Sequence, residues 1–218
     1  TAQPATTATY GRDAVWADYE VVAHLKESAN NSAGGYINSA GNSDGTGTSM
    51  SLANVAAKYG ADTAAFDIDK INFPISPVAT DDVFTAQAWG NMDDLSTDQR
   101  ILSLANSAGN SESVAAVWMD ADGSGDGWRG ITIDSGGTSY IAGLDSDNNA
   151  TASQWDMLHL KYGTSSQDLY LNGSSVATSS AGGDFSDGTD DSDEFLIANI
   201  WNNAGAANSF NGGVQEAR

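Results

Sequence analysis

Short apolar runs, bounded by Gly, Asn, Asp or Ser, recur along the whole chain. Many alternate apolar and polar positions. In WDMLHLKYG (155–163), one face has Trp155, Met157, His159 and Lys161, and the other has mostly Leu158, Leu160 and Tyr162. This period of two predicts half-buried strands. The predicted strands are 20–25, 65–75, 84–90, 100–105, 113–119, 129–134, 138–143, 155–163, 168–173, 174–180, 194–201 and 210–217.

The segments between these strands predict tight turns and almost no helix. Asn172-Gly173 supplies the positive-φ residues that a two-residue hairpin turn requires. Only 51–60 and 97–100 are candidates for short helical turns. Many short strands without a long amphipathic helix predict an all-β fold, a two-sheet antiparallel β-sandwich or jelly roll.

The pattern also predicts the domain organisation. Residues 1–13 are expected to be a lead-in tail or inter-domain linker, and residues 14–218 a single β-sandwich domain. The last residues, GGVQEAR, resemble a strand still in progress. We therefore expect one module of a longer protein.

The net charge of the chain argues against two classes of binding partner. The chain has 8 Lys plus Arg against 29 Asp plus Glu, which gives a formal net charge of −21. Such a surface repels phosphate backbones and anionic membranes, so we expect no nucleic-acid partner. No apolar run is long enough to cross a bilayer, so we expect no membrane insertion.

Three stretches resemble a known family. SQWDMLHLKYGTSSQDLYLNGSSVATSS (153–180) is similar to the core hairpin of laminin-G-like, concanavalin A-like jelly rolls, in which a Trp-containing strand leads into an LYVNG-type strand. FLIANIWNNAGAANSFNGGVQEAR resembles the F-x-G-x-I-D-E-V-R ending of that family, and YGRDAVWADYEVVAHLKES resembles the entry of its bacterial and phage-borne members. The resemblance implies a concanavalin A-like sandwich in a secreted, cell-surface or virion protein.

The same resemblance implies a bound calcium ion, but this sequence departs from the pattern of the family at one position. Laminin-G-type modules often carry calcium at the sandwich rim, held by loop Asp residues. In some relatives an Asp near the end also helps to hold a structural calcium. This chain has Gln215 in that place, followed by Glu216, which puts that particular site in question.

The resemblance also implies two sets of catalytic residues to look for, because some proteins of this fold are enzymes. Glycosidases carry E-x-D-x-E on one strand, because retaining hydrolysis needs two carboxylates about 5 Å apart. No Glu of this chain sits in that pattern, and Asp191, Asp193 and Glu194 are expected to precede a strand and not to line its face. Lyase relatives use an Arg, Gln, His and Tyr set from one sheet, but with only His24 and His159 available no such set emerges. His159 is interpreted as a surface histidine, and we expect no enzyme.

The stretch WMDADGSGDGWRG (117–129) is the candidate metal loop. Oxygen-bearing side chains alternate there: Asp120, Asp122, Ser124 and Asp126. A full EF-type loop is excluded, because the twelfth position from Asp120 is Ile131 and not the bidentate Glu. Two interpretations stay open: a polar hairpin turn, or a shallow calcium site formed by the three Asp side chains with carbonyls and water. A second acidic tract, 184–195, is interpreted as a solvated loop.

Tryptophans are the candidate sugar platforms, because sugar rings stack on exposed aromatic planes while Asn and Asp bind the hydroxyls. Trp89 and Trp118 lie within apolar strands and are expected in the core. Trp128, beside the acidic stretch, and Trp201 are expected to be more exposed. The candidate ligand residues are Trp128, Trp201, Asn202 and Asn203.

These patterns predict a non-catalytic binding module for a glycan or another surface ligand, with calcium as the candidate cofactor. The alternative is a structural, decoration or spacer domain that makes protein–protein contacts in an adhesin, filament or virus particle. A divergent glycan-degrading enzyme is a third hypothesis.

Overall fold

The computed structural model describes most of the chain, and every structural statement below concerns the described residues. These are 12–60, 62–67, 69–78, 83–105, 114–120, 127–133, 139–145, 150–163, 166–179, 192–199 and 210–218. No helix within these ranges has the length and apolar character needed to span a membrane.

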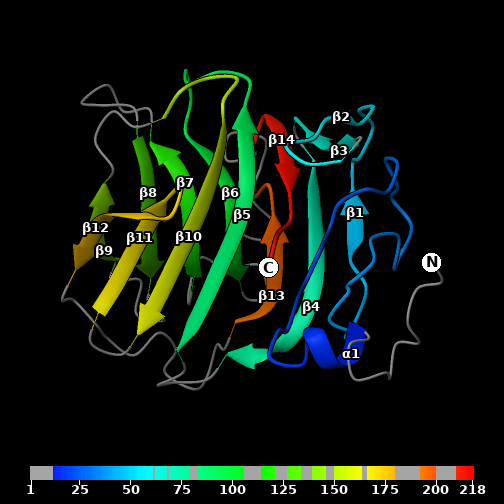
Figure 1. Cartoon of the computed structure of the whole chain (residues 1–218), viewed down its shortest axis with the longest axis horizontal. Helices are drawn as coiled ribbons and strands as arrows, with labels where there is room; N and C mark the ends of the chain where they lie inside the picture. Colours follow the sequence, from blue (N-terminus) through cyan, green and yellow to red (C-terminus); the bar gives the residue numbers. More distant parts are fainter. Residues whose placement is uncertain are drawn as a thin grey trace.

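Strands dominate the described residues (Figure 1). The elements are α1 (Arg12–Val15), β1 (Thr46–Thr48), β2 (Val55–Ala56), β3 (Asp62–Phe66), β4 (Lys70–Val78), β5 (Phe84–Met92), β6 (Gln99–Ala105), β7 (Val114–Asp120), β8 (Gly127–Ile133), β9 (Ser139–Asp145), β10 (Trp155–Gly163), β11 (Ser166–Leu171), β12 (Ser174–Ser179), β13 (Ser192–Ile197) and β14 (Gly212–Gln215).

The strands form two antiparallel sheets packed face to face, which confirms the predicted all-β sandwich. One sheet has the order β12-β11-β10-β5-β14-β3-β2, and the other has the order β1-β4-β13-β6-β7-β8-β9. Figure 1 looks onto the first sheet, here called the front sheet, with the paler strands of the second, the back sheet, behind it. Each sheet joins strands that lie far apart in sequence, as when β14 pairs between β3 and β5.

Alternation along the strands builds the core between the sheets. In β10 the even positions from Asp156 to Tyr162 are buried, whereas the odd positions are half-buried or exposed. Leu158 and Leu160 belong to an apolar cluster that also contains Phe73 and Ile101 of the back sheet. Burial of this apolar surface stabilises the sandwich, at about 25 cal/mol per Å² removed from water.

The β11–β12 hairpin confirms the predicted turn. Asn172 and Gly173 link the strands with φ values of 51° and 84°. Positive φ at both central positions is what a tight hairpin turn between right-twisted strands requires. The two strands then pair with Leu171 opposite Ser174.

Several local predictions are wrong. The run 65–75 is not one strand: it divides between β3 in the front sheet and β4 in the back sheet. The proposed helical turn at 51–60 contains the short strand β2, and Gln99 begins β6. Residues 20–25 form only isolated bridges at Ala23. Apolar periodicity cannot reveal where a chain changes sheets, because the core-facing pattern continues through the crossing.

The predicted lead-in 1–13 lies mostly outside the described residues, and α1 begins at Arg12. The proposed domain boundary therefore stays a prediction.

Candidate ligand-binding face

The outer face of the front sheet collects half-buried polar and aromatic side chains. Those of β10 are the odd positions Trp155, Met157, His159 and Lys161. Polar groups that are partly withdrawn from water on an open sheet face are available to a ligand. The neighbouring strands β5 and β11 add side chains on the same side.

Four of these residues form a polar row across adjacent segments: Tyr170, His159, Gln87 and Arg218. The register places Tyr170 of β11 opposite His159 of β10, and His159 opposite Gln87 of β5. On the other side of β5, the backbones of Gln87 and Arg218 exchange two hydrogen bonds, of 2.6 and 2.8 Å. The polar row thus combines residues from four separate parts of the sequence.

His159 is the most constrained member of the polar row. Its ring stacks on Tyr170 with a centroid separation of 5.1 Å. Its Nε2 atom is buried and has no hydrogen-bond partner among the described residues. Burial lowers the pKa of His159, and the charges of Arg218 and Lys161 lower it further. The lowered pKa favours the neutral imidazole at pH 7.

A cavity of about 760 Å³ opens beside the polar row. Its lining includes Gln87, His159 and Arg218 together with residues 18–21, and reaches the core residues Leu104 and Phe195 of the back sheet. The guanidinium of Arg218 lies over the ring of Tyr19, 5.6 Å from its centroid. The cavity has the size of a small-molecule or sugar subsite.

An aromatic patch occupies the same face nearer β14, formed by Tyr59, Trp89 and Trp155. Tyr59 meets Trp89 edge to face at 5.5 Å, and the Lys58 ammonium lies 5.5 Å from the centre of the Trp89 ring. Trp155 reaches across β5, because a Cβ on Gly213 of β14 would lie only 3.1 Å from its ring. Gly213 thereby leaves room for the indole.

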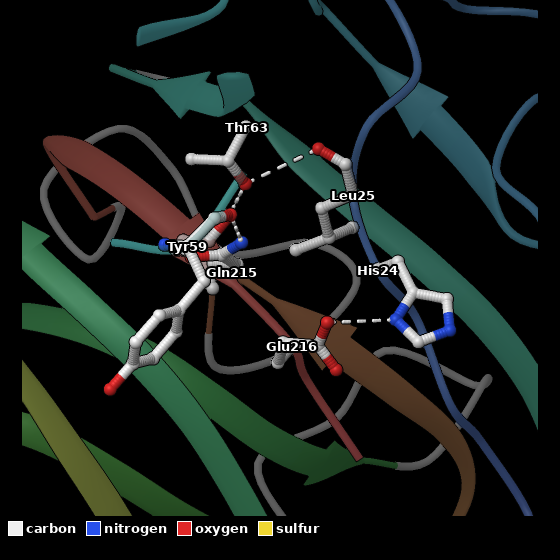
Figure 2. A network of polar contacts seen from close by, with 7 residues as sticks. His24, Leu25, Tyr59, Thr63, Gln215 and Glu216 are labelled. Carbon is white, nitrogen blue, oxygen red and sulfur yellow. Dashed lines mark hydrogen bonds and ion pairs between the residues drawn. The ribbon is translucent and has the colours of Figure 1, made fainter. Parts of the chain in front are cut away.

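Gln215 holds this patch together (Figure 2). Its side-chain amide accepts the N–H of Tyr59 at 3.0 Å and donates to the carbonyl of Tyr59 at 2.5 Å. On neighbouring β3, the Thr63 hydroxyl donates to the carbonyls of Leu25 and Val214. The residue that replaces the family's usual Asp therefore serves as a clip that fixes residues 57–60 over the sheet.

Glu216 points to a different partner. Its carboxylate lies 2.9 Å from Nδ1 of His24, and both side chains are about one-third exposed (Figure 2). Trp16 packs edge to face against His24 at 6.4 Å. This pair ties residues 14–28, here called the entry segment, to the end of the chain, and we assign it a structural role.

The structure describes one of the four predicted ligand residues, Trp128. The predicted exposure of Trp128 is wrong: its side chain is 0% exposed, and its N–H donates to Asp156 at 3.2 Å across the core. A fully enclosed indole offers no face to a sugar. Trp201, Asn202 and Asn203 lie outside the described residues.

The calcium prediction is not resolved by the described residues. Asp120 ends β7 and pairs with Gly127 of β8, so the acidic stretch joins two antiparallel neighbours. Asp122 and Asp126 lie outside the described residues. Within the described ranges, no three Asp, Glu, His or Cys side chains are grouped to hold a metal. Both interpretations of the hairpin therefore stay open.

Two interpretations of individual residues are wrong. Trp89 is half-buried on the outer face and is not in the core. Asp193 and Glu194 lie inside β13 and do not precede it, and Glu194 is buried and bonded to Asn72. The polar row also brings an Arg, a Gln, a His and a Tyr side by side, a neighbourhood that the sequence analysis did not find. The sequence contained one signal for it, the outward face of 155–163, but its partners become neighbours only through strand pairing.

A family profile described as the concanavalin A-like lectin/glucanases superfamily matches residues 62–218. The chain belongs to this superfamily. The match covers β3 to β14, the greater part of both sheets, and includes the polar row. No curated protein sequence matches the chain significantly.

Solved structures agree with this superfamily fold. Domain 4 of AbnA, a GH43 extracellular arabinanase from Geobacillus stearothermophilus in complex with arabinotriose, has a TM-score of 0.63 at 17% identity, covering 90% of this chain and 92% of that domain. The enzymatically active domain of tailspike protein 2 from bacteriophage CBA120 has a TM-score of 0.58 at 12% identity, covering 79% of this chain but only 28% of that one. At these identities the likeness establishes the concanavalin A-like fold.

Proposed function

We propose that the outer face of the front sheet binds a glycan without cleaving it. The observation that carries the proposal is the presence of the aromatic patch and the polar row on one continuous face. Sugars are recognised by stacking on aromatic rings and by hydrogen bonds to their hydroxyls, and this face supplies both. The arabinanase domain, which shares the fold and was determined with arabinotriose, supports a glycan as the ligand.

Binding to a panel of polysaccharides tests this function. We expect Trp89→Ala and Trp155→Ala each to weaken binding about tenfold, because a lost stacking contact contributes on the order of 1.4 kcal/mol. Ile37→Ala is the matched control, since Ile37 is exposed but lies outside the strands of the front sheet. Unchanged binding in both Trp variants would remove this face as the site.

The context of the module belongs to the same proposal. A binding domain of this kind suits a secreted, cell-surface or virion-associated protein, and the likeness to a domain of an extracellular arabinanase and to a phage tailspike supports it. The structural or spacer role remains the alternative. A chain that binds no glycan but assembles with protein partners would favour it.

Calcium at the β7–β8 hairpin is a separate proposal. Carboxylate oxygens on a short loop are suitable calcium ligands, and Asp120, Asp122 and Asp126 would supply them. Thermal unfolding should then shift upward with added calcium and downward with chelator, and the double variant Asp120→Ala, Asp122→Ala should abolish the shift. If neither calcium nor chelator changed the thermal midpoint of the wild-type protein, the hairpin would be a polar turn and not a calcium site.

Cleavage of the bound glycan is a second candidate function, favoured by the polar row. In an elimination reaction the neutral imidazole of His159 would take a proton from the sugar carbon beside a carboxylate, and the Tyr170 hydroxyl would protonate the leaving oxygen. Such an elimination leaves an unsaturated product that absorbs ultraviolet light. Its appearance on incubation with a polyuronate would replace the non-catalytic proposal, and its absence would support it.

A further inference from the structure

Positive charge is concentrated on the proposed binding face. The chain has only 8 Lys plus Arg. Three of them, Lys58, Lys161 and Arg218, lie on the outer side of the front sheet or directly over it. These three make up more than a third of the basic side chains of a chain whose net charge is −21.

The cations near the polar row form no direct ion pair with an acidic side chain. Lys161 and Arg218 have no Asp or Glu carboxylate within 4.0 Å among the described residues. Asp168 is opposite Lys161 in the register, and its carboxylate accepts the hydroxyl of Thr178 at 2.8 Å. His159 shares the outer face of β10 with Lys161 and lines the same cavity as Arg218. Positive groups gathered beside a cavity favour a negatively charged ligand.

The acidic residues of the cavity come from residues 18–20. Glu20 accepts the backbone N–H of Ser76 at 2.8 Å, and Asp18 is exposed to solvent. The strands of the front sheet contribute no carboxylate to the lining. The negative group of a ligand would therefore bind on the side of His159.

We propose that the end of the face formed by His159, Lys161 and Arg218 selects a glycan that carries negative charge, as a carboxylate or a sulfate ester. This inference rests on the proposed glycan binding and adds the class of sugar. It holds whether or not the sugar is cleaved.

A pH dependence follows from the same groups. The charged and titratable groups that face His159 are Lys161 on its own strand, Tyr170 and Asp168 on β11, Arg218 beyond β5, and Asp18 and Glu20 across the cavity. The pKa of His159 is lowered in the free protein by burial first and then by the two cations. A bound anion would raise it, so affinity should increase as the pH falls below about 6.5, by at most about tenfold per pH unit.

The decisive experiment compares polysaccharides that differ only in charge. Polygalacturonate and its methyl ester form one pair, and a galactan with and without sulfate esters forms the other. We expect the charged member of at least one pair to bind ten or more times more tightly, with the preferred pair identifying carboxylate or sulfate. Lys161→Gln and Arg218→Gln should each remove most of that preference, whereas Lys26→Gln, which removes an exposed cation outside the front-sheet strands, should retain it.

The outcomes separate the two proposals. Equal binding of charged and neutral members, still abolished by Trp89→Ala, would overturn the charge selection and leave the glycan face intact. Absence of binding to every polysaccharide would overturn the proposed function and this inference with it. A preference that survives in both Lys161→Gln and Arg218→Gln would overturn the assignment to these residues.

Discussion

At the residue scale, Asp156 and Asp69 show two ways in which a carboxylate is buried in this protein. Asp156 accepts hydrogen bonds from the side chains of Trp128, Gln154 and Asn172 at 2.9 to 3.2 Å. Asp69 is 1% exposed, and burial together with the nearby charge of Asp67 raises its pKa. The first carboxylate is compensated by donors, whereas the second is strained toward its protonated form.

Asp69 should make the protein less stable as the pH rises. The unfolded chain releases this proton at a pH of about 3.9, but the folded chain holds it to a higher pH. The free energy of unfolding therefore falls as the pH rises from about 3.9 through the folded pKa. We expect Asp69→Asn to be more stable than wild type at pH 7 and not below about pH 3.9, as measured by denaturant unfolding. Asp93→Asn, at an exposed site that does not contribute to this shift, is the control; an Asp69→Asn difference that does not vary with pH would contradict the argument.

Trp128 should be essential for stability and not for binding. Trp128→Phe removes a donor from buried Asp156 and leaves a void, so we expect a loss on the order of 2 to 4 kcal/mol. A double-mutant cycle with Asp156→Asn measures the coupling between the two side chains, expected at about 1 kcal/mol. Glycan affinity of the folded variant should equal that of wild type. A specific loss of affinity would return Trp128 to the ligand site.

At the element scale, β14 links the end of the chain to the binding face. Its residue Gly213 makes room for Trp155, and Gln215 clips residues 57–60 beside Trp89. Both features depend on β14 being inserted between β3 and β5. The sequence ending GGVQEAR resembles a strand, but nothing in it shows that its amide holds a segment more than 150 residues earlier.

The clip predicts a change in backbone dynamics. In Gln215→Ala the amide of Tyr59 loses its acceptor, so its hydrogen exchange should accelerate by about tenfold or more. Gln215→Glu retains the acceptor but places a carboxylate against the Tyr59 carbonyl, so it should lose part of the protection as well. We also expect weaker glycan binding in the Ala variant, because Tyr59 no longer packs reliably against Trp89. Unchanged exchange at Tyr59 would show that other contacts hold the segment.

At the scale of the whole molecule, the negative net charge of the chain contrasts with the cations on the binding face. A net charge of −21 repels itself, and the repulsion is stronger in the compact state than in the unfolded chain. The binding face, by contrast, presents cations to the ligand. Salt screens both interactions, with opposite consequences for stability and for binding.

Raising the salt concentration should therefore separate the two effects. Between about 0.01 M and 1 M NaCl the Debye length falls from about 30 Å to about 3 Å. We expect the thermal midpoint to rise by a few degrees while affinity for a charged glycan falls. Calorimetry and binding titrations on the same samples measure both. A midpoint that falls with salt would mean that attractive ion pairs outweigh the self-repulsion.

The sequence by itself determined the class of fold, the strands of the front sheet from 155 onward, and the Asn172-Gly173 turn. These features are local, because the period of two along a strand and the positive φ at a turn depend only on residues that are adjacent in sequence. The tertiary structure alone decided which side of each strand faces outward, so that Trp89 is on the surface while Trp128 is enclosed. It also decided the register that aligns Tyr170, His159, Gln87 and Arg218. Strand pairing joins residues far apart in sequence, and a shift of one residue would turn each side chain to the opposite face, so no local pattern could reveal this row.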